Sequence, residues 1–83
     1  MELRAIIDLD LHGLGVEEAQ TKIENAIKSA GSGVYRIRCI HGFHGGTRIK
    51  DMIRREFGFG LEPKVKSIRP GENEGITELI LRE

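Results

Sequence analysis

The sequence has little of what crosslinks or anchors secreted and membrane proteins: one cysteine, two prolines and no long hydrophobic run. The lone Cys39 cannot form an internal disulfide, so we expect it to be a small core residue. No segment approaches the roughly 20 apolar residues of a membrane span, and the first residues lack the features of a secretory signal. We therefore predict a cytoplasmic protein that has no membrane partner.

The chain also lacks an excess of charge of either sign, because 13 Lys and Arg residues balance 13 Asp and Glu residues. This balance hides an uneven distribution, since residues 31–70 hold nine basic side chains and only three acidic ones. A basic half of this kind attracts the phosphate backbone of nucleic acids. Charge alone is equally consistent with an ordinary mixed surface.

Hydrophobic periodicity predicts a two-layer α/β sandwich. The length suits one two-layer core, so we assign residues 1–83 to a single domain and expect a shallow site. The expected elements are strand, helix, strand, helix, strand and strand, over residues 3–11, 16–30, 34–40, 47–57, 64–69 and 76–82. Turn formers in residues 70–75 predict that the last strand returns antiparallel. Right-handed crossovers place both helices on one face of the sheet.

All three histidines lie in two glycine-bearing motifs, residues 8–13 (DLDLHG) and 41–47 (HGFHGGT), each at the expected end of a strand. If the first two strands are parallel neighbours, the two motifs lie side by side at about 5 Å strand spacing. Ligands of open α/β sheets favour this edge. We therefore predict a catalytic group of Asp10, His12 and His41. His12 oriented by Asp10 would activate water or a ribose hydroxyl, and His41 or loop amides would stabilise charge.

The second motif opens a helix with glycines, which let backbone N–H groups approach an anion at the positive end of the helix dipole. An aromatic side chain at a glycine-flanked tip, Phe43, would stack on an unpaired base or pack onto the core. We predict that the nucleic-acid or phosphate contacts come from Gly42, Phe43, His44, Gly45, Gly46, Thr47, Arg48 and Lys50.

Several of these residues also have an ordinary structural explanation. Asp8 and Asp10 would form surface ion pairs with Arg36 and Arg38 of the second strand, which contribute little to stability. The glycines would serve only tight turns.

A divalent metal ion is a further alternative, because Asp8, Asp10, His12 and His41 offer oxygen and nitrogen donors. No HxxxH or cysteine-rich spacing supports a zinc site. The sequence assigns no metal ligand and leaves metal dependence open.

The two motifs resemble the hallmarks of the Smr (small MutS-related) domain family, an LDLHG sequence (Leu9 to Gly13) and an HGxG-type loop beginning at His41. The resemblance extends over essentially the whole chain, including VEEA at Val16 to Ala19 and a GxTxL-like segment at Gly75 to Leu79. It implies a βαβαββ fold with a four-stranded sheet of order 1-2-4-3, whose last strand is antiparallel. It also implies nucleic-acid binding and, in several members, endonuclease activity on DNA or RNA.

The second loop departs from the family pattern HGKGTGxL, because it reads HGFHGGTRI and carries one extra residue near Phe43 or His44. The first motif, with His12, is similar to that of free-standing members, while a domain excised from a larger protein stays an alternative. We expect an endonuclease that nicks or cleaves structured DNA or RNA; the alternative is an RNA- or DNA-binding module without hydrolysis, including one that is associated with the ribosome. The sequence does not choose DNA over RNA or give an oligomeric state.

Overall fold

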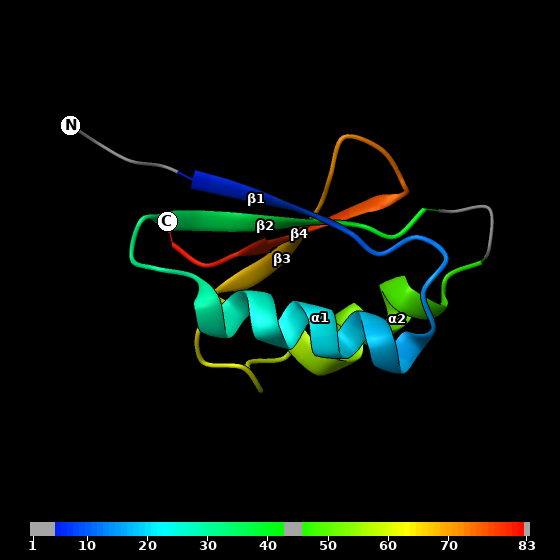
Figure 1. The fold of residues 1–83 in the computed structure, drawn as a ribbon, viewed down its shortest axis with the longest axis horizontal. Helices are drawn as coiled ribbons and strands as arrows, with labels where there is room; N and C mark the ends of the chain where they lie inside the picture. Colours follow the sequence, from blue (N-terminus) through cyan, green and yellow to red (C-terminus); the bar gives the residue numbers. More distant parts are fainter. Residues whose placement is uncertain (1–4, 43–45, 83) are drawn as a thin grey trace.

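A computed structural model describes residues 5–42 and 46–82. The elements in chain order are β1 (Ala5–Asp10), α1 (Val16–Ser29), β2 (Val34–Ile40), α2 (Arg48–Phe57), β3 (Ser67–Pro70) and β4 (Ile76–Ile80). The sheet order is β1-β2-β4-β3, with β1 parallel to β2 and β4 antiparallel to both of its neighbours. Both helices cover one face of the sheet (Figure 1). The predicted topology is therefore confirmed.

The core lies between the sheet and the helices. Along β1, Ile7 and Leu9 pack against this core while Asp8 and Asp10 are exposed, as the alternation predicts. The buried apolar side chains of this core are Leu11, Ala19, Ile23, Ile27, Ile37, Cys39, Ile49, Met52, Ile53, Phe57, Val65, Leu79 and Leu81. Burial raises the pKa of the Cys39 thiol to about 12, so this thiol stays protonated and the prediction of a core cysteine is confirmed.

The helices bury stripes of apolar residues at the spacing of a helical face. In α1 these are Ala19, Ile23 and Ile27, one turn apart, and α2 buries Ile49, Met52, Ile53 and Phe57. Both helices lie within a residue of their predicted ends. No helix in the described part of the chain is long and apolar enough to cross a bilayer.

The last two strands are shorter than predicted, and local hydrogen bonds explain the difference. A turn at Glu62 delays β3, because the Glu62 carbonyl accepts the Val65 N–H (3.0 Å) and its carboxylate accepts the Lys64 N–H (3.2 Å). After Ile80, the N–H groups of Leu81 and Arg82 both donate to the Tyr35 carbonyl (2.9 and 3.2 Å), which ends the regular ladder.

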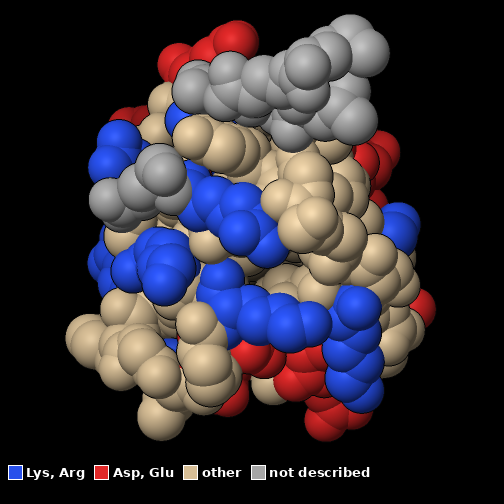
Figure 2. All heavy atoms as spheres, turned by 90° about the vertical axis from the view of Figure 1, so that its left-hand side faces the viewer, with Lys and Arg blue, Asp and Glu red and all other residues tan. Residues whose placement is uncertain are grey.

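Charged side chains divide between several surfaces. Figure 2 views the end of the molecule where β2 begins, and Lys and Arg gather across the middle of this view. Lys64, Lys66 and Arg82 line a pocket of about 330 Å³ together with Val34, the first residue of β2. On the sheet face away from the helices, which we call the open face, Arg36 pairs with Glu78 (Nη1 to Oε1, 2.6 Å).

The open face also holds one of the aspartate pairs considered from the sequence. Arg38 Nε lies 3.0 Å from Asp8 Oδ1, and Arg38 Nη1 lies 3.7 Å from Glu72 Oε1. Asp10 is not part of this network, because its carboxylate contacts His12 instead.

Candidate functional site

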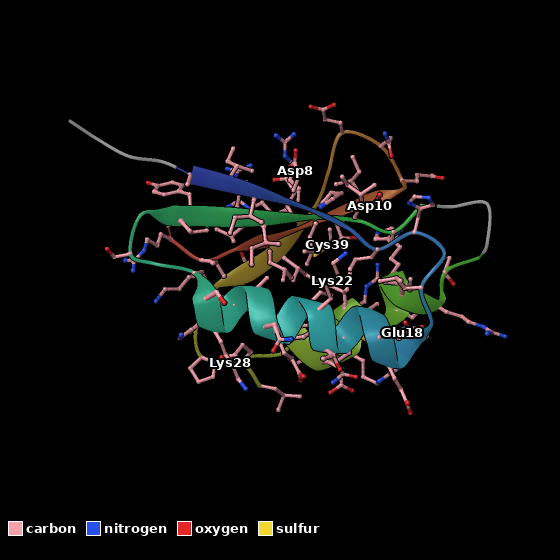
Figure 3. All side chains as sticks on the ribbon, in the orientation of Figure 1. Asp8, Asp10, Glu18, Lys22, Lys28 and Cys39 are labelled. Carbon is pink, nitrogen blue, oxygen red and sulfur yellow. The ribbon has the colours of Figure 1, made fainter. Side chains whose placement is uncertain are left out.

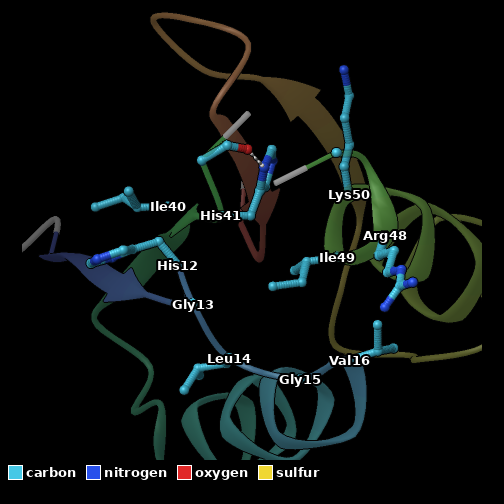
Figure 4. A pocket seen from close by; sticks show the side chains of 12 residues that line it. His12, Gly13, Leu14, Gly15, Val16, Ile40, His41, Arg48, Ile49 and Lys50 are labelled. Atoms are coloured by element: carbon cyan, nitrogen blue, oxygen red, sulfur yellow. Dashed lines mark hydrogen bonds between the residues drawn. The ribbon is translucent and has the colours of Figure 1, made fainter. Parts of the chain in front are cut away.

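The carboxyl ends of β1 and β2 and the starts of both helices border one cleft of about 590 Å³ (Figure 4). It is lined by residues that we call the rim: His12, Gly13, Leu14, Gly15, Val16, Ile40, His41, Gly42, Gly46, Arg48, Ile49 and Lys50. The two histidine motifs touch here, since a Cβ added to Gly42 would lie 3.7 Å from the Cβ of His12. The structure thus brings together the two motifs that the sequence placed at one edge.

Backbone geometry explains three glycines of the rim. Gly13, Gly42 and Gly46 have φ values of +78°, +75° and +93°, a region that other residues rarely adopt. A Cβ on Gly13 or Gly46 would meet no atom of the described residues within 4 Å, and the positive φ itself favours glycine at both positions. These turns need glycine whether or not an anion binds.

Asp10 and His12 form a hydrogen-bonded pair at the outer lip of the cleft. Asp10 Oδ1 lies 2.5 Å from His12 Nδ1 and also accepts the His12 backbone N–H at 3.2 Å. The side-chain bond from His12, with the backbone bond second, lowers the pKa of Asp10 below its ordinary value. The carboxylate therefore stays charged and binds Nδ1, and Nε2 of the largely exposed imidazole makes no hydrogen bond to a described residue.

The position of this pair is fixed from the helix layer. Lys22 of α1 donates from Nζ to the Asp10 carbonyl at 3.1 Å, so the end of β1 is tied to the helix (Figure 3). In Figure 4 the His12 ring points away from Ile49 and Val16 on the other side of the cleft. The imidazole therefore points outward from the lip of the cleft into solvent.

His41 is placed differently, because it is buried (9% exposed) and both of its ring nitrogens are engaged. Nδ1 donates to the Gly42 carbonyl (2.8 Å), and Nε2 lies 2.8 Å from the Thr77 hydroxyl oxygen. The His41 and Gly42 N–H groups both donate to the Gly75 carbonyl, at 2.9 and 3.0 Å. The contacts of His41 are those of a residue that positions the second motif against β4.

Thr77 and Gly75 are residues of this site that the sequence reasoning did not assign. A signal was present, because both belong to the GxTxL-like segment at residues 75–79. What the sequence could not show is that this segment is paired with the end of β2, where Ile40 lies opposite Ile76.

The two helix starts at the rim differ in their attraction for anions. At α1 the Gly15 N–H donates to the Glu18 carboxylate (3.3 Å), so this start already holds an acid of its own. The first turn of α2 also has an acid, Asp51, which accepts a hydrogen bond from the Thr47 hydroxyl (2.9 Å), but Arg48 and Lys50 outnumber it and line the cleft. The first turn of α1 has two acids, Glu17 and Glu18, so the side-chain charge favours an anion at α2 rather than at α1.

Three of the predicted phosphate-binding residues, Phe43, His44 and Gly45, lie outside the described residues. The set of metal donors considered from the sequence does not assemble: over residues 5–42 and 46–82, no three His, Cys, Asp or Glu side chains are grouped to hold an ion. Asp8 is engaged by Arg38 and the nitrogens of His41 are occupied.

Comparisons with known proteins agree on one family. Residues 9–78 match the family model described as the Smr domain. The chain is also similar to the crystal structure of the Smr domain of Thermus thermophilus MutS2, with 30% sequence identity and a TM-score of 0.77. That alignment covers 93% of this chain and 99% of the other. A comparison with curated proteins gives no match.

Proposed function

The chain belongs to the Smr domain family, and we propose that it is a nucleic-acid-binding endonuclease that cleaves structured DNA or RNA at the rim. The observation that supports the proposal is that two different chemical features lie at the same cleft. A hydrogen-bonded Asp10–His12 pair borders the same cleft as the basic start of α2. One part suits proton transfer and the other suits a phosphate.

The phosphate is held at the start of α2. The backbone N–H groups of its first turn, with the side chains of Arg48 and Lys50, bind the phosphodiester at the positive end of the helix dipole. Gly42 and Gly46 line the same cleft, and Thr47 is the residue before the helix. The contacts expected of Phe43, His44 and Gly45 stay predictions from the sequence. The same donors stabilise the charge that develops on the phosphorane oxygens.

Proton transfer falls to the Asp10–His12 pair. His12 Nε2 takes a proton from water or, in RNA, from a ribose hydroxyl, whose oxygen forms a bond to phosphorus while the bond from phosphorus to the leaving sugar oxygen breaks; that oxygen takes up a proton from the solvent. Asp10 holds the imidazole through Nδ1 and stabilises the imidazolium that forms. His41, which we predicted to be catalytic, contributes by holding Gly42 and the loop in place, because its own nitrogens are occupied. In this proposal the contact with the reacting groups is made by His12.

A cleavage assay with matched aspartates tests the proposal. Purified protein is incubated with branched DNA and with single-stranded and structured RNA, with and without a chelator. We expect His12→Gln to lower the cleavage rate about 10²- to 10⁴-fold, the usual contribution of a general base, and Asp10→Asn to lower it as well. Asp8→Asn is the control, because Asp8 and Asp10 share one strand face and have nearly equal side-chain exposure, 60% and 59%.

The comparison of the two aspartates decides the outcome. Cleavage that survives both His12→Gln and Asp10→Asn contradicts the proposed roles, as does equal loss in Asp8→Asn. Loss of cleavage only in the presence of the chelator would add a metal ion to the mechanism. Circular dichroism of each variant separates a loss of activity from a loss of fold.

A nucleic-acid-binding module without hydrolysis is the second candidate. It is favoured by the exposure of His12, whose side chain is 72% accessible, because catalytic pairs generally work where water is excluded. This candidate predicts uncleaved substrates whose migration in gels is retarded by the protein, and retardation that weakens as salt is raised.

A further inference from the structure

A second basic surface continues from the rim into a groove between α2 and β3. This groove, about 300 Å³ in volume, is lined by Lys50, Arg54, Ile68, Arg69, Pro70 and Thr77. Its three charged residues are all basic. Lys50 lines both the rim cleft and the groove, and Thr77 is the partner of His41. The two surfaces are therefore continuous.

The cations of this groove form no ion pair with a described carboxylate. Lys50, Arg54 and Arg69 have none, whereas Arg36, Arg38 and Arg55 each have at least one. The acid opposite Arg69 on β4 is Glu78, which pairs with Arg36 instead. Lys50 and Arg54 are four residues apart on α2, which is about 6 Å along the helix axis. Residues four apart lie on the same side of a helix, so the two cations line one path along α2 on which the phosphates of a single strand bind.

An exposed aromatic residue lies at the far end of α2. The helix ends at Phe57, and a Cβ added to the next residue, Gly58, would lie 3.2 Å from the Cδ1 atom of the groove residue Ile68. Phe59 follows and is 73% exposed, one of the largest apolar exposures in the described chain. An exposed ring stacks on an unpaired base of any sequence.

From this arrangement we infer that the groove holds a single nucleic-acid strand, which leaves the rim past Lys50, runs over Arg54 and Arg69, and stacks one base on Phe59. This inference rests on the proposed function, because it extends the strand bound at the rim. It names the substrate class: a nucleic acid with an unpaired segment next to the phosphate held by α2, since bases within a duplex are already stacked.

Binding of labelled oligonucleotides tests the charged part of the groove. Oligothymidylate and oligouridylate of about eight and about sixteen nucleotides, and a blunt duplex of the longer length, are titrated with protein at several salt concentrations. Arg54→Gln and Arg69→Gln are each expected to weaken single-strand binding about threefold to tenfold. Each should also lower the slope of log affinity against log salt by about 0.7. Arg55→Gln is the control, because Arg55 adjoins Arg54 on α2 but contacts Glu56 (Nε to Oε2, 3.1 Å) and does not line the groove.

The stacking role of Phe59 is tested with a second variant and its own control. Phe59→Ala is expected to weaken single-strand binding roughly fivefold to 150-fold, the range for one stacked base, and to leave binding of the blunt duplex unchanged. Leu61→Ala is the control, because Leu61 is equally exposed (70%) in the same loop and has no ring. Equal losses in both variants would overturn the stacking role of Phe59.

The outcomes separate this inference from the proposed function. If the wild-type protein binds none of the oligonucleotides but cleaves branched DNA or structured RNA, the inference is contradicted and the proposed function stands; if it neither binds nor cleaves any of them, both are contradicted. If the wild-type protein binds them but Arg54→Gln and Arg69→Gln bind as well as Arg55→Gln, the inference about the groove is contradicted. The proposed function of the rim is not affected by that result. Thermal unfolding of all five variants is the check on folding, and no change is expected because the substituted side chains are exposed or intermediate in burial.

Discussion

Two sets of basic residues, one on the open face and one along the rim and groove, differ in what their charges contact. On the open face Arg36 is held by Glu78, and Arg38 lies between Asp8 and Glu72. Along the rim and groove Arg48, Lys50, Arg54 and Arg69 have no such partner among the described residues. All six belong to the basic residues 31–70. Pairing therefore separates cations that stabilise the sheet from cations that are available to an external anion.

The largest effect that would test this difference is on stability. Arg36→Gln and Glu78→Gln each break an ion pair in which the carboxylate side is only 12% exposed, and leave a charge without its partner. We expect each to lower the free energy of unfolding by about 2 kcal/mol, less than for a fully buried pair because Arg36 is partly accessible. Arg54→Gln should change it by less than about 0.5 kcal/mol. Urea denaturation measures all three.

Equal destabilisation by Arg36→Gln and Arg54→Gln would remove the distinction between the two sets. The double variant Arg36→Gln, Glu78→Gln tests the same point further, because with both partners neutral no charge is left uncompensated. Its loss of unfolding free energy should be smaller than the sum of the losses in the two single variants.

The sequence predicted the face of each charged residue but not its partner. Asp8 and Asp10 are the same residue type on the same strand face, and the sequence offered Arg36 and Arg38 to both. The register of β1 against β2 determines the partner of each aspartate. Asp8 lies opposite Arg38, whereas Asp10 lies opposite Ile40 and is hydrogen-bonded to His12. This register includes a shift between Ala5 and Ile6, which no alternation pattern reveals. The topology and the core could be predicted from hydrophobic periodicity, because that pattern is the sum of many residues and does not depend on any one contact.

The same limit applies to the histidines of the candidate site. The motifs predicted that His12 and His41 lie at one edge, and both line the cleft. Their different environments depend on long-range pairing, since the partner of His41 is Thr77, 36 residues further along the chain. A pattern of local spacing contains no information about that contact.

A second prediction tests whether the hydrogen bond between His41 and Thr77 stabilises the rim, as ion pairs stabilise the open face. Thr77→Val keeps the side-chain shape and removes the hydroxyl that contacts His41 Nε2. We expect a loss of about 1 kcal/mol in the free energy of unfolding, and weaker nucleic-acid binding because Gly42 is less firmly held. Thr77→Ser, which keeps the hydroxyl, should restore both. Binding that is unchanged in Thr77→Val would show that His41 does not position the second motif.

The smallest expected effect concerns the acid titration of Asp10, which links the open face to the rim. Hydrogen bonds from His12 hold the pKa of Asp10 below its ordinary value of 3.8. Because the folded-state pKa is lowered, the stabilisation is present above the unfolded value and is lost as pH falls through the folded one. Carbon-13 NMR of the carboxyl group should give a midpoint below 3.8 in the wild-type protein and one closer to 3.8 in His12→Ala. A midpoint that does not move in His12→Ala would mean that the imidazole is not bound to Asp10 in solution, and the proposed proton acceptor would then lack its orienting partner.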